Sequence, residues 1–228
     1  MHLCRTAPRL VFVGAAVFFC ALSARVRAGD DFGSWHAVSA TFLDQSDWTL
    51  SALGQLRFRD DSSNLFAYVL SAQTVWKASS YLRLGMNYTV LPAKPAGSRD
   101  FRGQRRWEIE VNPRWPVNAA LTLDLRNRIE VRWIEGRAGT NLRSRHRPQA
   151  TWRLKGAGRL ESVYANNEFF WDHDADRYTS NRLVPLGLNF RVNPQTVAGV
   201  YYMLWSVRSG TGGWSHSHVL GTRLALRL

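Results

Sequence analysis

A strict two-residue alternation of apolar and polar side chains constrains this chain more than any other feature of its sequence. In residues 48–58 every second position is apolar or small, and the positions between them, apart from Leu53, are polar or cationic. The apolar set consists of Trp48, Leu50, Ala52, Gly54, Leu56 and Phe58. Because successive side chains of a β-strand point to opposite faces, this period predicts a strand with one apolar and one polar face.

The same period returns up to the last residue and predicts an all-β chain with eleven candidate strands. In lipid, only a closed barrel satisfies all hydrogen bonds of such strands, so we predict a transmembrane antiparallel up-and-down β-barrel. Bacterial single-chain barrels have even strand numbers, so we expect roughly 10–12 strands, with twelve slightly favoured. The connections are predicted to alternate between short periplasmic turns and longer external loops.

The first 28 residues have the composition of a cleavable signal peptide. Arg5 and Arg9 precede an apolar run at residues 10–22, and Val26 and Ala28 form a small-residue cleavage site. A transmembrane anchor is the alternative, but the run is shorter than the about 20 residues that a spanning helix needs. We therefore predict a signal peptide at residues 1–28 and a single barrel domain at residues 29–228.

Cysteine content and charge limit the chemistry and the partners that the chain can have. Cys4 and Cys20 are the two cysteines of the chain, so the predicted mature protein has no thiol for disulfide or zinc chemistry. The formal net charge is +13, and removal of the four arginines among the first 28 residues leaves +9. These cations alternate with apolar residues along predicted strands and form no basic helix or patch, which argues against nucleic acid as a partner.

Aromatic side chains indicate which face of the strands meets lipid. They lie near the two ends of the apolar stripes, as the two interfacial girdles of a membrane barrel require, whereas a soluble core would concentrate them in the middle. The predicted membrane-interface aromatics are Trp48, Phe58, Phe66, Trp76, Trp107, Trp115, Trp133 and Trp152. The alternative is a soluble barrel whose apolar set points inward.

With the apolar set facing lipid, the lumen carries an unusual number of charged side chains on three consecutive strands. Neighbouring strands hold such side chains about 5 Å apart, so guanidinium–carboxylate pairs are expected. A structural network that fills a narrow barrel is the favoured interpretation, and an anion-selective pathway or pocket is the alternative. The predicted lumen-facing set is Arg106, Glu108, Glu110, Arg114, Asp124, Arg126, Arg128, Glu130, Arg132, Arg143, Arg145, Arg147 and Arg153.

Two segments contain residue types that occur in catalytic or metal-binding sites. Ser215, His216, Ser217 and His218 offer a serine and a histidine near the barrel rim, but no carboxylate or amide that would orient the imidazole can be placed. The acidic residues 172–176 lack the glycine and distal glutamate of a helix–loop–helix calcium site, and a solvated external loop is favoured. We predict no catalytic residues, no metal site and no cofactor.

Several short segments together resemble the bacterial family known as domain of unknown function 2490. They are W-x-x-x-S at 35–39, R-F-R at 57–59, R-N-R-I-E at 126–130, R-S-R-H-R-P at 143–148, N-N-E-F-F at 166–170, N-R-L-V-P-L-G at 181–187 and H-V-L-G at 218–221. The resemblance spans nearly all of residues 30–228. It implies an outer-membrane barrel with no established activity and no catalytic residues to carry over.

We therefore expect a non-enzymatic, porin-like protein of a Gram-negative outer membrane, structural or weakly anion-selective. Its expected partners are outer-membrane lipid, periplasmic chaperones and the barrel-assembly machinery in transit, and a small anion. A lipid-acting hydrolase at the barrel rim and a soluble periplasmic ligand-binding barrel are the alternatives. The sequence leaves the oligomeric state open.

Overall fold

The computed structural model describes residues 31–208 and 212–228. These residues belong to one compact unit, Asp31–Leu228. The predicted signal peptide at residues 1–28 lies outside the described residues.

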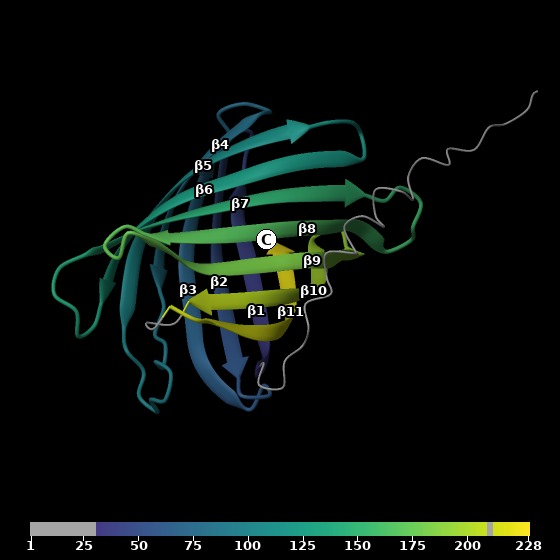
Figure 1. Ribbon diagram of the computed structural model, residues 1–228. Coiled ribbons are helices and arrows are strands. Elements are labelled where there is room, and N and C mark those ends of the chain that lie inside the picture. Colours follow the sequence, from purple (N-terminus) through teal and green to yellow (C-terminus); the bar gives the residue numbers. More distant parts are fainter. Residues whose placement is uncertain (1–30, 209–211) are drawn as a thin grey trace, which may run out of the picture. The chain divides into compact units, whose positions relative to one another are not determined.

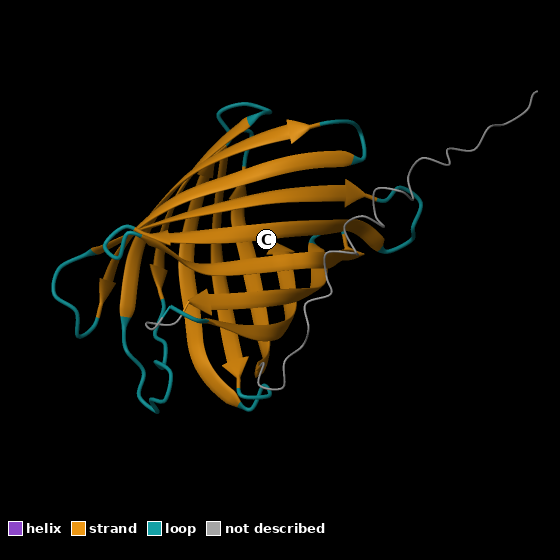
Figure 2. Ribbon diagram, viewed as in Figure 1, coloured by secondary structure: helices purple, strands orange, loops and turns teal. Residues whose placement is uncertain are grey.

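The described residues form eleven β-strands and no helix (Figures 1 and 2). The strands are β1 (Asp31–Asp44), β2 (Trp48–Arg59), β3 (Asn64–Trp76), β4 (Leu82–Val90), β5 (Gln104–Pro116), β6 (Leu121–Ile134), β7 (Asn141–Arg153), β8 (Leu160–Asp172), β9 (Arg177–Asn193), β10 (Thr196–Arg208) and β11 (Trp214–Arg227). The predicted all-β class is confirmed. No helical segment in the described ranges has the length and apolar character needed to cross a bilayer.

The strands close into a barrel in which each strand pairs with its sequence neighbours. All of these pairs are antiparallel, whereas β1 and β11 pair in parallel. Strand directions alternate along the chain, so the first and last of an odd number of strands run the same way and must close in parallel. Eleven strands lie within the predicted range of ten to twelve, but the expectation of an even number was wrong for the described residues.

The connections fall at two ends of the barrel, and their lengths differ less than the sequence suggested. Residues 45–47, 77–81, 117–120, 154–159 and 194–195 connect strands at one end, which we call the short-turn end. The opposite, long-loop end carries residues 60–63, 135–140 and 173–176, which are also short, and residues 91–103, which are long. Among the described connections, the predicted difference between short and long holds only at residues 91–103, where Ala93 pairs with Arg102 and with Ala67 of β3.

The apolar stripe of each strand points outward and the charged stripe inward. Ile109, Leu123 and Leu186 are 60%, 40% and 48% exposed, whereas Arg145 is 6% exposed and Glu130 is fully buried. This confirms the predicted direction of the alternation. It is the reverse of a soluble globular protein, whose large apolar side chains gather in the interior.

Two β-bulges change the phase of the alternation. A register shift opposite Arg57 and Phe58 of β2 turns Phe66 of β3 inward, where it is 7% exposed. Shifts on both sides of β9 likewise bury Val184, although Leu186, two residues later, is exposed. An extra residue in one strand moves the following side chains to the other face. The prediction of Phe66 as an interface aromatic was therefore wrong.

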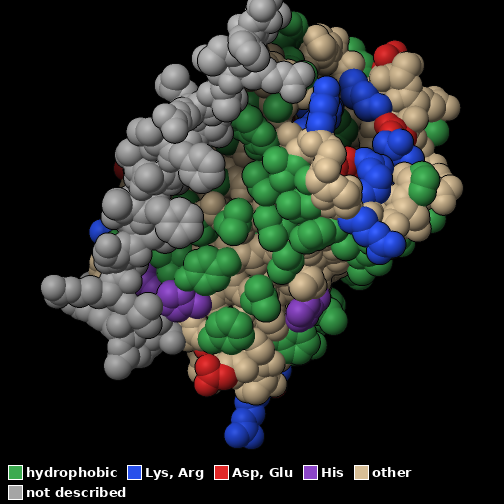
Figure 3. All heavy atoms as spheres, turned by 90° about the vertical axis from the view of Figure 1, so that its right-hand side faces the viewer, with side chains coloured by type: hydrophobic (Ala, Val, Ile, Leu, Met, Phe, Trp, Pro, Cys, Tyr) green, Lys and Arg blue, Asp and Glu red, His purple; other side chains and the backbone are tan. Residues whose placement is uncertain are grey.

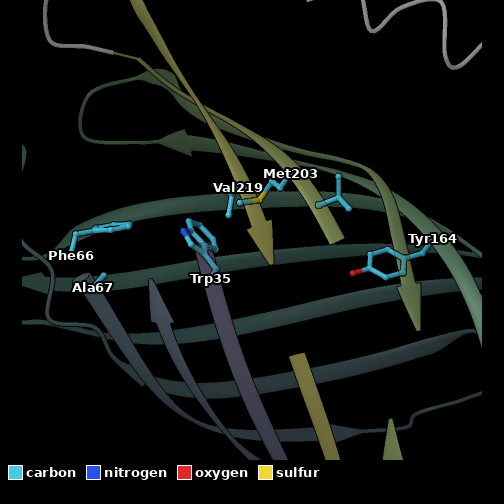
Figure 4. Packing of buried hydrophobic residues seen from close by; sticks show 7 residues of the cluster. Trp35, Phe66, Ala67, Tyr164, Met203 and Val219 are labelled. Atoms are coloured by element: carbon cyan, nitrogen blue, oxygen red, sulfur yellow. The ribbon is translucent and has the colours of Figure 1, made fainter. Parts of the chain in front are cut away.

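The interior contains a small apolar cluster in addition to its charges. It consists of Trp35, Phe66, Ala67, Tyr164, Val184, Met203 and Val219, and most of it is shown in Figure 4. Met203 and Val219 are register partners on β10 and β11, and Trp205 packs against the cluster. Phe66 and Ala67 lie at the start of β3 and Trp35 near the start of β1, so the cluster lies toward the long-loop end.

Candidate functional site

The predicted lumen-facing residues lie on the inner wall of β5, β6 and β7, and most of them are buried. Arg106, Glu108, Glu110, Arg128, Glu130, Arg132 and Arg145 are buried, and Arg114, Asp124, Arg126, Arg143 and Arg147 are partly exposed. Arg153 has the inward phase, but as the last residue of β7 it is exposed at the short-turn end and forms no ion pair within the described ranges.

Glu130 is the centre of the interior ion pairs. Its carboxylate accepts hydrogen bonds from Arg143 Nε at 2.7 Å and from Arg145 Nη1 at 2.5 Å. Arg106 and Arg128 approach the same carboxylate at 3.7 and 3.9 Å. A buried carboxylate needs such partners to offset the loss of its hydration.

A second group of ion pairs joins β5 to β6. Arg106 Nε lies 2.6 Å from Glu108, and Arg128 bridges Glu108 and Glu110. The amide of Asn87 on β4 donates to both carboxylates at 3.2 Å. The β5–β6 register places Glu108 directly opposite Glu130, so the ion pairs that Arg106 forms with Glu130 and Arg128 with Glu108 are diagonal.

Glu168 on β8 is a central member that sequence reasoning missed. Arg145 donates to it at 2.8 Å, Arg126 forms a close ion pair with it, and Arg182 of β9 lies 3.8 Å away. Glu168 belongs to the N-N-E-F-F segment of β8, where both sets of alternate residues mix apolar and polar side chains, so the period does not show which set points inward.

Arginine side chains stack on the aromatic rings of the apolar cluster. The guanidinium of Arg57 lies 4.2 Å from the centroid of Trp35. Arg182 lies 4.8 Å from Trp35 and 4.7 Å from Phe170. Contacts of this kind stabilise a cation where water is excluded. These rings and the ion pairs of Glu108, Glu130 and Glu168 occupy the long-loop half of the lumen. We call this set of ion pairs and rings the sealing layer.

An interior cavity of about 470 Å³ adjoins the sealing layer. Its lining includes Leu53, Gln73 and Thr151, which extend it toward the short-turn end. The charged side chains of the lining are Arg57, Arg106, Arg126, Arg128, Arg145, Arg147, Arg182, Arg223, Glu108 and Glu168. Cations thus dominate its wall.

Two tyrosines on the cavity wall lie flat over glycines of neighbouring strands. A Cβ at Gly187 would lie 2.1 Å from the Tyr164 ring, and one at Gly221 would lie 1.9 Å from the Tyr201 ring. Tyr164 and Gly187 are register partners, as are Tyr201 and Gly221. Glycine at these positions lets the rings lie along the wall without projecting into the cavity.

On the outside, the predicted interface aromatics form two bands. Trp48, Trp76, Trp115 and Trp152 are exposed near the short-turn end, and Trp107 and Trp133 are exposed near the long-loop end. Trp48 and Trp76 stack at 6.2 Å, and Tyr88 packs on Trp107 at 5.0 Å. Phe58 is half-buried beside His36.

Residues 215–218 and 172–176 form no complete catalytic or metal-binding site. His216 lies 2.9 Å from Ser206 Oγ, its register partner on β10, and no carboxylate or amide partner of His216 occurs among the described residues. Asp172 pairs with Arg132 at 2.8 Å, and Asp174 accepts a hydrogen bond from Asn141. The described part of the chain contains no group of three or more His, Cys, Asp or Glu side chains arranged for a metal ion.

Comparison with known proteins identifies a family and no characterised relative. No curated protein and no solved structure matches the chain. Residues 32–216, which include β1 to β10 and the start of β11, match the family described as "Protein of unknown function (DUF2490)". The chain therefore belongs to the DUF2490 family.

Proposed function

We propose that this protein is a non-enzymatic barrel of the Gram-negative outer membrane whose lumen is closed by the sealing layer. The observation that carries the proposal is the inverted distribution of side chains, with apolar residues outside and paired charges inside. Soluble monomers seldom expose apolar patches larger than a few hundred Å², because such surfaces associate in water. Lipid is the solvent that suits this exterior.

The two outer bands of tryptophan support the same location. Tryptophan favours the boundary between hydrocarbon and water, and membrane barrels carry such girdles at both ends. Trp115 and Trp107 lie near opposite ends of β5, and both are exposed. Outer-membrane lipid is the partner that these bands imply, with periplasmic chaperones and the barrel-assembly machinery as partners before insertion.

The sealing layer favours a structural role over a constitutively open pore. Glu130 and Glu168 each bind more than one arginine from nearby strands, and Arg182 stacks on the rings of Trp35 and Phe170. A barrel of this strand number is only slightly wider than one that side chains fill. A closed lumen suits a scaffold or anchor.

Density-gradient fractionation of envelopes tests the location. The protein is expected in the outer-membrane fraction and to need detergent for release. Recovery in the soluble periplasmic fraction without detergent would favour the soluble ligand-binding barrel instead.

Planar-bilayer recordings test the closed lumen. The native protein is expected to give no steady current, and Trp35→Ala combined with Trp205→Ala is expected to open brief conductance steps. Trp133→Ala on the outer surface is the matched control. A steady current through the native protein would contradict the closed lumen.

A weakly anion-selective channel is the second candidate, and the excess of arginine on the cavity wall favours it. Reversal potentials in a salt gradient test this candidate. Any current through the protein is expected to be carried by anions. A preference for cations would remove this candidate.

Phospholipid deacylation tests the alternative of a lipid-acting hydrolase. If His216 and its serine neighbours formed an active site, His216→Ala and Ser217→Ala would abolish deacylation of phospholipid. We expect no deacylation above background in the native protein or in either variant, and Ser206→Ala serves as the third comparison because Ser206 is the hydroxyl that contacts His216.

A further inference from the structure

Inward side chains are buried in the long-loop half of the lumen and become exposed toward the short-turn end. Inward residues of the long-loop half, such as Trp35, Ala67 and Val219, are almost completely buried. Arg223 also points inward, since it lines the cavity and donates to Asn189 Oδ1 at 2.9 Å, yet it is exposed. The cavity is therefore accessible to water from the short-turn end and blocked toward the long-loop end.

Three arginines of the cavity wall have no carboxylate within ion-pair distance among residues 31–208 and 212–228. Arg57 donates to Gln55 at 2.8 Å and stacks on Trp35, and Arg223 donates to Asn189. Arg147 forms no ion pair within the described residues, and its buried Nε has no hydrogen-bond acceptor. In contrast, Arg106, Arg126, Arg128 and Arg145 all bind glutamates.

Unpaired guanidinium groups that have lost part of their hydration raise the free energy of the folded state unless an anion compensates them. The planar guanidinium donates two parallel hydrogen bonds to phosphate or carboxylate oxygens, so such groups select oxyanions. The remaining wall supplies neutral donors, among them Gln149, Asn166 and Thr151. Polar and charged side chains outnumber apolar ones on the wall, which disfavours a purely apolar ligand.

The entrance is cationic as well. Figure 3, which faces the side toward which β5 and β7 run in Figure 1, shows Lys and Arg side chains gathered around a hollow. Arg83, Arg153, Lys155 and Arg159 lie near the short-turn end and form no ion pair in the described part of the chain. A cationic mouth attracts anions and raises their local concentration.

We propose that the cavity binds a small, soluble, multiply charged oxyanion, carrying phosphate or carboxylate groups, which enters from the short-turn end and is held by Arg57, Arg147 and Arg223. The volume of about 470 Å³ is large enough for an organic phosphate or tricarboxylate. The proposal depends on the closed lumen and its charges, and it does not depend on where the protein is located in the cell.

Pyrophosphate and citrate serve as probes. The purified protein in non-ionic detergent is titrated with each at constant ionic strength, set with sodium chloride, and binding is followed by calorimetry and by the midpoint of thermal unfolding. We expect saturable binding of both probes and a raised midpoint, and no saturable effect of chloride. Absence of saturable binding of either probe would overturn the proposal.

Arg147→Gln combined with Arg223→Gln tests the site. Neither arginine has a carboxylate partner, so the variant is expected to fold and to be at least as stable as the native protein without ligand, while its affinity for pyrophosphate falls tenfold or more. Arg147→Lys keeps the charge and is expected to retain most of the affinity. Arg137→Gln, an exposed loop residue at the long-loop end, is the matched control. Equal affinity of the double variant and the control would contradict the assignment.

Lipid headgroups carry phosphate too, and nanodiscs distinguish the two sources. Pyrophosphate is expected to bind equally in nanodiscs of phosphatidylcholine and of phosphatidylglycerol. If phosphatidylglycerol abolishes pyrophosphate binding and raises the midpoint by itself, the ligand is a headgroup and the proposal of a soluble ligand is wrong.

Discussion

At the scale of the residue, Glu130 shows how a charged interior is stabilised. It is fully buried on β6, and four arginines from β5, β6 and β7 surround its carboxylate. Burying any one of these charges alone would cost several kcal/mol, and their mutual attraction offsets that cost only while the set is complete. Single changes at its centre should therefore have large effects.

Glu130→Gln tests this dependence. The amide has one acceptor oxygen in place of two and points donors at arginines. Arg143 then has no carboxylate partner among the described residues, and Arg145 keeps only Glu168. We expect the free energy of unfolding in detergent to fall by about 3–5 kcal/mol, measured by urea titration.

Asp47→Asn is the control for this variant, since Asp47 is an exposed turn residue whose side chain contacts no cation in the described residues. Its effect should stay within about 0.5 kcal/mol. A similarly small effect of Glu130→Gln on the free energy of unfolding would mean that the ion pairs contribute little to stability.

Gly221→Ala tests the packing of tyrosine against the inner wall. Its Cβ would lie 1.9 Å from the Tyr201 ring, so the ring must move off the wall. Overpacking of this kind costs about 1–3 kcal/mol. At Gly54 the nearest atom would be 3.9 Å away, so Gly54→Ala should be neutral or slightly stabilising in the same urea titration. Equal results for the two variants would contradict the packing.

Individual residues also show what a sequence can predict. Glu108, Arg128 and Glu130 were placed in the lumen because β5 and β6 alternate without interruption at these positions. The prediction for Phe66 is wrong because a bulge shifts the phase of β3, and a bulge has no signature in a period of two. The sequence does not predict Glu168 because both sets of alternate residues in β8 mix apolar and polar side chains. Arg57 and Trp35 are register partners in the β1–β2 hairpin, whereas the contact between Arg182 of β9 and Trp35 of β1 depends on closure of the barrel.

At the scale of the element, the parallel contact between β1 and β11 is the feature that local sequence patterns do not contain. Alternation predicts strands and their faces, and short connections predict antiparallel neighbours. How the first strand meets the last depends on the total number of strands. An odd number requires a parallel seam, with Ser39 opposite Ala225.

Paired cysteines test the seam. Residues 29–228 contain no cysteine, so Ser39→Cys with Ala225→Cys gives one possible intramolecular disulfide. The two Cα atoms of neighbouring strands lie about 4.8 Å apart, within reach of a disulfide. We expect nearly complete cross-linking of the refolded barrel after mild oxidation, seen as altered migration without reductant.

Thr41→Cys with Ala225→Cys is the matched control, because Thr41 pairs with Arg227, two residues further along β11. Its Cα is offset by roughly 6.6 Å along the strand, so it should cross-link poorly. Preferred cross-linking of the control pair, or none of either pair, would contradict the parallel register.

At the scale of the whole molecule, the barrel combines an apolar exterior with a lumen that is closed toward one end and open toward the other. The exterior follows from the alternation of the sequence, and the closure follows from ion pairs and rings contributed by at least six strands. The closure needs the complete fold, because strands distant in the sequence must meet across the lumen, whereas the apolar exterior does not.

The central claim is that the exterior of this barrel faces hydrocarbon, and nitroxide accessibility in lipid vesicles tests it most directly. A spin label on a single cysteine at Ile109 or Ile129, which are register partners exposed on the outer wall, should be reached by molecular oxygen and protected from a water-soluble nickel complex. A label at Thr151, on the wall of the cavity, should show the opposite preference. Contact of the nickel complex with Ile109 and Ile129, as at Thr151, would contradict the account.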